Sequence, residues 1–165
     1  MKPRCAPGAG AQCINMAVCE RWGVANFFAD GPSAGLLDVM PEDRKSATLS
    51  RNPGLTAVAV TCGPLGDILA LTGASRFDLF SLDIEQSELF AVDTMAWATF
   101  PVHVLVMERD ERYLSSATEK IDRILVEAGF KYWGQQRGNM VFVNPANART
   151  EAEWQTLSTT PNLVS

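Results

Sequence analysis

From residue 55 onward, short apolar runs alternate with segments that have helical spacing, and this alternation strongly limits the possible folds. The strand-like runs are residues 55–62, 77–85 and 102–109, and each is followed by a segment that can form a helix. Alternation of strands and helices is typical of an α/β domain built on a mostly parallel sheet. We therefore predict an α/β fold with such a sheet.

Local signals indicate where the helices start and how the sheet ends. Pro64 suits the first turn of a short helix, Ser87 can cap a second helix, and a third is expected over residues 116–128, before Gly129. Residues 130–143 hold two strand-like runs around the turn-forming sequence GQQRG, which indicates a hairpin. We expect the sheet to end in this antiparallel hairpin.

The first part of the chain is less regular. Residues 14–20 and 23–28 resemble short strands, whereas residues 41–53 are polar and indicate a surface loop. We divide the chain into a loose segment at 1–13, a domain at 14–145, and a polar tail at 146–165, with a short helix expected near 152–157. A length of 165 residues fits one domain.

Composition excludes several classes of partner. The net charge of -5 gives no basic footprint for nucleic acid. The chain has no apolar run of about 18 residues, so no membrane span is expected. The basic start at Met1 is not followed by the apolar region of a secretory signal. These features together favour a cytoplasmic protein.

The four cysteines, at positions 5, 13, 19 and 62, form no closely spaced pair of the kind that zinc sites use. We interpret them as reduced, mostly buried thiols in a non-oxidising compartment. A module that binds metal through Cys5, Cys13 and Cys19 remains an alternative. The single histidine, His103, is interpreted as a residue of the sheet rather than a catalyst.

Acidic residues follow two of the apolar runs. Asp83 and Glu85 close the run at 77–85, and Glu108 comes at the end of VHVLVME. In parallel α/β sheets, ligands bind outside the carboxyl ends of the strands, so these acids lie where a site is expected. Glu88 is better explained as an acid that favours the N-terminus of the next helix.

The amino-acid sequences of these segments, and their order along the chain, resemble those of the FkbM family of S-adenosylmethionine-dependent methyltransferases. The specific part is FDLFSLDIEQSEL at residues 77–89, which is similar to that family's strand, acid pair and following helix. PLGDIL before it, VHVLVMERD after it, and EAGF followed by NMVFVNP agree with the family in order and spacing. The resemblance covers roughly residues 14–145.

The resemblance implies a Rossmann-like methyltransferase fold and methyl transfer from S-adenosylmethionine to an oxygen nucleophile on a small molecule or glycan. It implies catalytic roles for Asp83, Glu85 and Glu108. Asp83 is also expected to bind the cofactor, together with Asn15, which would lie near the adenine. No metal is implied.

The chain departs from the family pattern in two places. Gln86 stands where the family has Gly, and Gly permits backbone angles that Gln resists. No acid-and-glycine loop for the cofactor precedes Ile14, so we expect a truncated chain with a partial fold and an exposed edge on the strand at 77–85. The alternative is a non-catalytic remnant that binds a protein partner, or itself, through this open edge.

Overall fold

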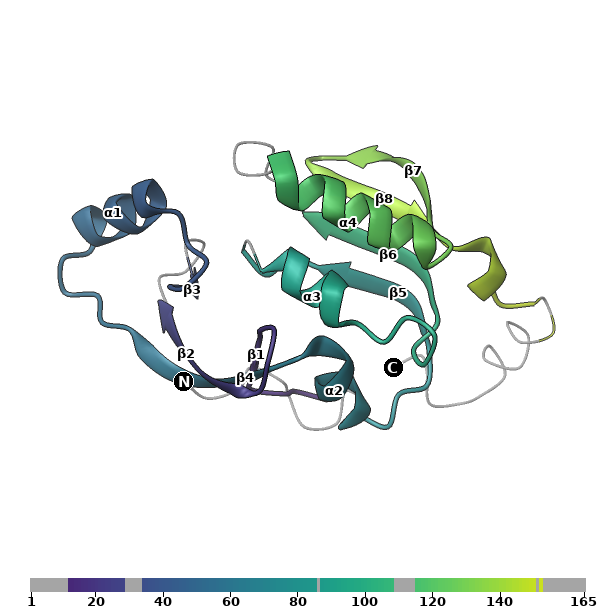
Figure 1. The fold of residues 1–165 in the computed structure, drawn as a ribbon, viewed down its shortest axis with the longest axis horizontal. Coiled ribbons are helices and arrows are strands. Elements are labelled where there is room, and N and C mark those ends of the chain that lie inside the picture. Colours follow the sequence, from purple (N-terminus) through teal and green to yellow (C-terminus); the bar gives the residue numbers. More distant parts are fainter. Residues whose placement is uncertain (1–11, 29–33, 86, 109–114, 151, 153–165) are drawn as a thin grey trace, which may run out of the picture.

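The computed structural model describes residues 12–28, 34–85, 87–108, 115–150 and 152 (Figure 1). Strands and helices alternate along most of this part of the chain. In order, the elements are β1 (Ala17–Val18), β2 (Gly23–Phe28), β3 (Gly35–Leu36), α1 (Glu42–Arg51), β4 (Val58–Gly63), α2 (Leu65–Ala70), β5 (Phe77–Leu82), α3 (Glu88–Thr94), β6 (Val102–Glu108), α4 (Ser115–Glu127), β7 (Lys131–Gln136), β8 (Asn139–Val143) and η3 (Pro145–Asn147).

The strands form two sheets, so the prediction of one mostly parallel sheet is wrong. The first sheet has the order β1-β4-β2-β3 and the second has the order β5-β6-β8-β7. Only β1–β4 and β5–β6 pair in parallel, and the other pairs are antiparallel. Short connections, such as the two residues between β7 and β8, force neighbouring strands to run antiparallel. The fold is a mixed α/β arrangement.

The hairpin expected at residues 130–143 is confirmed. β7 and β8 pair from Lys131↔Val143 to Gln136↔Asn139. The two turn residues between them, Arg137 and Gly138, have φ of 51° and 89°. Positive φ at both central residues is the geometry of a type I′ turn, whose twist matches that of the flanking strands. The second sheet therefore combines the parallel pair β5–β6 with a closing antiparallel hairpin.

The polar stretch predicted as a loop at 41–53 contains a helix instead. α1 follows Pro41, has Glu42 and Asp43 in its first turn, and has Arg51 in its last turn. Acids near the N-terminus and a base near the C-terminus both favour the helix dipole. The charged ends, rather than an apolar face, therefore mark this helix in the sequence.

The other helices lie close to their expected positions. α2 follows Pro64, and Gly73 beyond it has φ of 70°. Ser87 occupies the N-cap position of α3, but its side chain makes no capping hydrogen bond. α4 is followed by Gly129 with φ of 89°, the left-handed geometry that commonly ends helices. Ala152 is helical, and the rest of the helix expected there lies outside the described residues.

The larger core fills the space between the second sheet and helices α2 to α4. α3 and α4 cover one face of this sheet (Figure 1). Leu105 on β6, Leu125 on α4 and Ala91 on α3 have no exposed surface. The buried members of this larger core are Leu65, Leu82, Ala91, Val92, Met95, Phe100, Val102, Leu105, Met107, Ile121, Leu125, Phe130 and Phe142.

The first sheet has a much smaller core. Its buried members are Ala25, Leu36 and Cys62, with Cys19 packed against them. Cys19 and Cys62 form a disulfide with a Cα–Cα distance of 5.7 Å, which joins the chain after β1 to β4. The prediction of reduced thiols is therefore wrong for this pair, and Cys13 is also disulfide-bonded.

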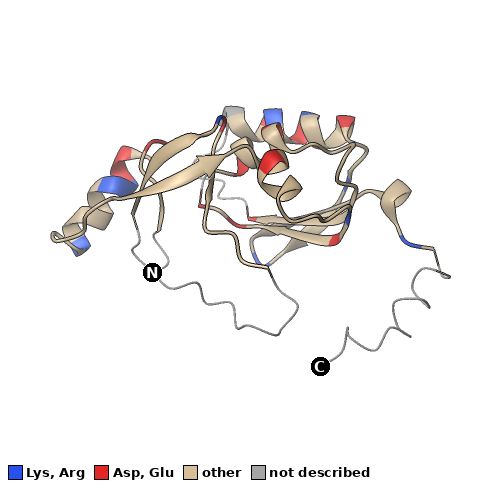
Figure 2. Ribbon diagram, turned by 90° about the horizontal axis from the view of Figure 1, so that it is seen from below, with Lys and Arg blue, Asp and Glu red and all other residues tan. Residues whose placement is uncertain are grey.

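Among the described helices, none has both the length and the apolar character needed to cross a membrane. Both α1 and α4 carry acidic and basic residues (Figure 2): the acids precede the bases along α1, whereas the two signs alternate along α4. The charged surface of these helices therefore consists of both signs.

Candidate functional site

The register of the second sheet places acidic residues from two strands at one edge. Leu82, the last residue of β5, pairs with Met107 on β6, so Asp83 directly follows one strand where Glu108 ends the other. One carboxylate oxygen from each of Asp83, Glu85 and Glu108 lies within 4.8 Å of the other two. We call these three residues the acid cluster. The structure thus brings together the three acids that the sequence singled out.

The acid cluster changes the proton affinity of one of its members. Partial desolvation, a side-chain hydrogen bond with Asp83 and the negative charges of Asp83, Glu85 and Glu88 raise the pKa of Glu108 from 4.5 to about 7. A hydrogen bond between two carboxyl groups requires a proton on one of them, because an ionised carboxylate only accepts. Near neutral pH, Glu108 therefore exchanges its proton readily, as a general acid or base must.

This pKa makes stability depend on pH in a defined direction. The folded chain holds the Glu108 proton more tightly than the unfolded chain, so the free energy of unfolding falls as pH rises from about 4.5 through about 7. We expect Glu108→Gln to remove this fall and to flatten the pH dependence of stability over that window. Urea unfolding at several pH values would measure it. Glu119→Gln, on the exposed side of α4, is the control. An unchanged slope in Glu108→Gln would contradict the assignment.

Glu85 is held in an unusual backbone conformation. Its φ of 54° lies in the left-handed region, which costs a residue with a side chain about 1–2 kcal/mol. Its carboxylate forms a short ion pair with the guanidinium of Arg44 on α1, and both side chains are partly buried. Gly35 on β3 lies close to the Glu85 backbone, since an added Cβ there would be 3.6 Å from the Glu85 carbonyl oxygen.

Sequence reasoning did not identify Arg44 as part of this arrangement. The residue belongs to the stretch interpreted as a surface loop, and its partner is 41 positions away in the chain. The acidic start and basic end of α1 could have revealed the helix, but not what its side chains contact. The contact depends on how the two sheets are placed.

Glu88 makes a structural contact through its side chain, and His103 makes one through its backbone. The Glu88 carboxylate is buried and accepts a hydrogen bond of 3.0 Å from the backbone N–H of Ile84. This contact ties the loop after β5 to the first turn of α3. The backbone carbonyl of His103, within β6, accepts a hydrogen bond of 2.8 Å from the Asn144 backbone.

Asn15 belongs to a different part of the fold from the strands that carry the acids. It is exposed and precedes β1, which belongs to the first sheet, whereas the acid cluster belongs to the second. The structure therefore brings together Asp83, Glu85 and Glu108, and the role of Asn15 stays a prediction.

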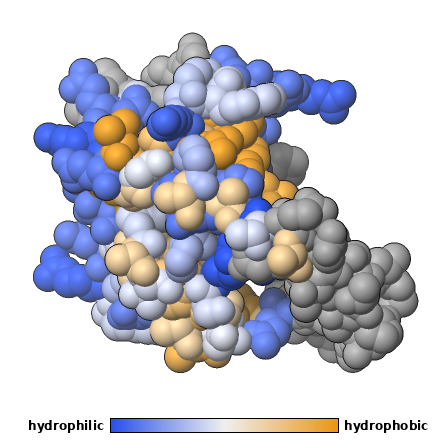
Figure 3. Space-filling view, turned by 90° about the vertical axis from the view of Figure 1, so that its right-hand side faces the viewer, coloured by the Kyte–Doolittle hydropathy of each residue, from blue (hydrophilic) through white to orange (hydrophobic). Residues whose placement is uncertain are grey.

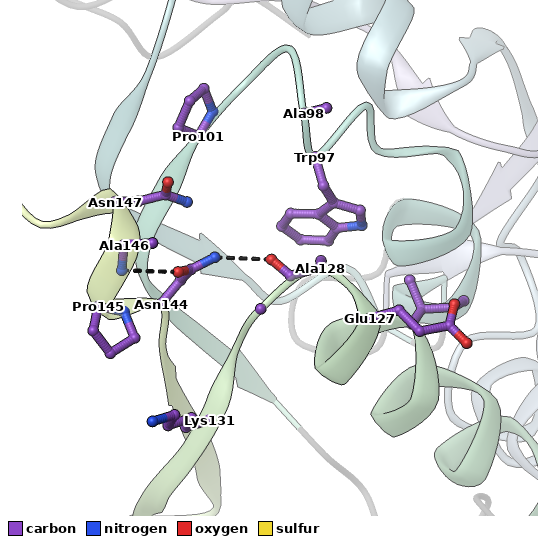
Figure 4. Close-up of a pocket in the computed structure, with 12 residues that line it drawn as sticks. Trp97, Ala98, Pro101, Glu127, Ala128, Lys131, Asn144, Pro145, Ala146 and Asn147 are labelled. Atoms are coloured by element: carbon purple, nitrogen blue, oxygen red, sulfur yellow. Dashed lines mark hydrogen bonds between the residues drawn. The ribbon is translucent and has the colours of Figure 1, made fainter.

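A pocket of about 810 Å³ opens elsewhere on the second sheet (Figure 4). It is lined by Trp97, Lys131 and Asn144 among others, and contains none of the predicted site residues. The Asn144 side chain forms internal hydrogen bonds there, to the Ala128 carbonyl at 2.8 Å and from the Ala146 N–H at 3.1 Å. Its polar groups therefore hold η3 against α4.

This pocket lies at the opposite end of the strands from the acid cluster. The side chain of Asn147, in its lining, donates to the carbonyl of Val102, the first residue of β6, whereas Glu108 is the last. At about 3.3 Å per residue, β6 separates the two places by roughly 20 Å. The side of the molecule that carries η3 shows apolar surface interspersed with hydrophilic surface (Figure 3). We therefore base the chemistry on the acid cluster and not on the pocket.

The metal alternatives can be compared with the side chains present. Cys13 and Cys19 are in disulfides, so they offer no thiolate for the proposed thiol site. The acid cluster has a spacing at which three carboxylates could share a cation, although exposed acids often gather without one. One of these acids, Glu108, is also hydrogen-bonded to Asp83.

Comparison with known proteins identifies the family. The family model described as the methyltransferase FkbM domain matches residues 3–132, which is more than half of the chain and includes the whole acid cluster. Searches of curated proteins and of solved structures each gave no match. The segment order, the DIEQSEL motif after β5 and the family match agree, and the chain belongs to the FkbM methyltransferase domain family.

Proposed function

We propose that this protein takes part in methyl transfer from S-adenosylmethionine to a hydroxyl group of a small molecule or glycan. The observation that carries the proposal is the acid cluster, in which Glu108 is hydrogen-bonded to Asp83 and the pKa of Glu108 is raised to about 7. A hydroxyl acceptor loses its proton as its oxygen is methylated. A carboxyl group that titrates near neutral pH is well suited to accept that proton.

The roles of the three acids follow from their positions. Asp83 and Glu108, joined by their hydrogen bond, take the hydroxyl proton and orient the acceptor oxygen. Glu85, whose charge is balanced by Arg44, lines the acceptor side of the site. Each acid is at the carboxyl edge of β5 or β6, where open α/β sheets bind ligands.

The residues present fit the charge of the proposed cofactor. S-adenosylmethionine supplies a methyl group on a positively charged sulfonium, and the negative charges of the acid cluster favour a cation at this edge. Asp83 is the residue proposed to lie beside the cofactor, and Asn15 is proposed to contact its adenine from the first sheet. Both assignments come from the family resemblance, and Asn15 is exposed at the start of the described chain.

Binding and transfer can be tested together on the natural protein. We expect calorimetry to detect binding of S-adenosylmethionine, weakened in Asp83→Ala because a negative charge beside the sulfonium is lost. Incubation of the protein with small-molecule and glycan fractions and methyl-labelled cofactor should then give a labelled ether. Neither heat of binding nor label incorporation, in a protein whose circular dichroism shows a folded state, would contradict the proposal.

A second candidate function rests on a different observation. β5 lies at the edge of the second sheet, and among the described residues only β6 pairs with it. Leu79 on this strand is 63% exposed. An edge strand with apolar residues is a template for pairing with another chain. In this candidate, the protein is a non-catalytic module that binds a protein partner or a second copy of itself through β5.

Hydrogen exchange and sedimentation distinguish the second candidate from the first. If β5 pairs with a second copy, its amides should gain protection as protein concentration rises, while sedimentation shows a dimer. A strand that stays equally exposed at all concentrations and in the presence of cell extract would contradict this candidate.

A further inference from the structure

Glu85 is placed where electrostatics alone would not keep it. Its carboxylate lies within 4.8 Å of those of Asp83 and Glu108, and carboxylates at that spacing repel one another. The backbone also adopts left-handed geometry at this residue. Since the side chain is only partly buried, it could reduce the repulsion by turning toward water. Some other contact must hold it in the cluster.

The contact that satisfies this requirement comes from another part of the chain. Arg44 on α1 forms an ion pair with Glu85, and the Arg44 side chain is 18% exposed, so water screens the pair less than an exposed one. Gly35 on β3 also lies near this residue, since a Cβ added at Gly35 would be 3.6 Å from the Glu85 carbonyl oxygen. Glu85 is thus held from the side of the first sheet, while Asp83 and Glu108 extend from the second.

From this geometry, we propose that Arg44 is a positioning residue for the acid cluster: its ion pair with Glu85 keeps that carboxylate beside Asp83 and Glu108. The inference rests on the acid cluster as the proposed site of methyl transfer, and it adds a residue that acts on the site through another. Arg44 itself is not required to touch the acceptor or the cofactor.

The proposal makes a prediction that separates positioning from simple charge compensation. The groups that raise the pKa of Glu108 include Asp83, Glu85 and Glu88, but Arg44 is not one of them. If Arg44 holds Glu85 in place, Arg44→Gln releases Glu85 toward water, and the pKa of Glu108 falls below its value of about 7. If Arg44 only balances charge, the same substitution leaves more negative charge nearby, and the pKa rises.

The measurement is the titration of the Glu108 carboxyl carbon by NMR. We expect Arg44→Gln to lower its midpoint by about half a pH unit, the order expected for a partly screened charge. Lys45→Gln is the matched control: it is the next residue on α1 and removes the same charge, but its ion partner is Glu42. The control should leave the midpoint unchanged. A midpoint that rises in Arg44→Gln, or that moves equally in both variants, overturns the proposal.

A double-variant cycle shows whether Arg44 acts through Glu85. Glu85→Gln removes the same negative charge directly and should lower the Glu108 midpoint by itself. Adding Arg44→Gln should then cause no further fall, because the residue to be positioned is already neutral. Arg44→Lys, which keeps the charge, should retain most of the wild-type midpoint and serves if Arg44→Gln does not fold. Two additive falls would overturn the proposal.

These readouts do not depend on methyl transfer. If the protein proves not to bind S-adenosylmethionine while the Glu108 midpoint shifts as expected, the proposed function fails and the role of Arg44 stands. If transfer is observed and the midpoint is insensitive to Arg44, the function stands and the positioning role fails. The two proposals can therefore be judged separately.

Discussion

Replacing Asp83 by Asn is expected to lower the rate of methyl transfer at least about 100-fold, the lower end of what a positioned proton acceptor contributes. Asn has nearly the size of Asp and can still hydrogen-bond Glu108, but it carries no charge and accepts no proton. The rate of label transfer from the cofactor, measured at saturating acceptor, reports the loss. Asp93→Asn is the matched control, since Asp93 pairs with Lys120 on the surface away from the acid cluster.

A second readout shows whether such a loss comes from chemistry or from misfolding. Asp83 raises the pKa of Glu108 through a hydrogen bond and through its negative charge. In a folded Asp83→Asn variant, the loss of that charge should therefore lower the Glu108 midpoint, and the circular dichroism spectrum should stay unchanged. A variant that transfers methyl groups at the wild-type rate would exclude Asp83 from the reaction.

The sequence contained enough information to place most strands but not to pair them. The strands β5 and β6 are rich in apolar residues, so their positions were predictable. An apolar run does not reveal whether its strand pairs parallel or antiparallel to a neighbour. The alternation of strands and helices from residue 55 suggested parallel pairing throughout. The antiparallel pairs of β4 with β2 and of β6 with β8 arise from the path of the chain between strands.

The same distinction applies to the candidate site. Asp83 and Glu108 could be predicted as site residues because they lie at the ends of predicted strands. Their proximity results from the register of these two neighbouring strands. Arg44 and the Cys19–Cys62 disulfide join residues 41 and 43 positions apart, and no local pattern specifies such pairs. A residue such as Arg44, which contacts the site from a helix distant in the sequence, therefore cannot be identified from local sequence patterns.

The Cys19–Cys62 disulfide is expected to contribute most of the stability of the first sheet. Only three described residues are buried in that core, and one of them is Cys62 itself. In the chain-entropy account, a cross-link that closes a loop of this length stabilises the folded state by about 4 kcal/mol. Cys19→Ser with Cys62→Ser should therefore lower the free energy of unfolding of this sheet by about that amount.

Hydrogen exchange can locate the effect within the molecule. The double variant, or the wild-type protein reduced by a dithiol, should lose amide protection in β2 and β4, while β6 and α4 keep theirs because the larger core is intact. The dithiol should have no effect on these strands in the double variant, which is the internal control. Since α1 connects β3 and β4 of this sheet and carries Arg44, we also expect the contact with Glu85 to weaken on reduction. Equal protection of β2 and β4 in the oxidised and reduced protein would mean that the small core holds the sheet without the disulfide.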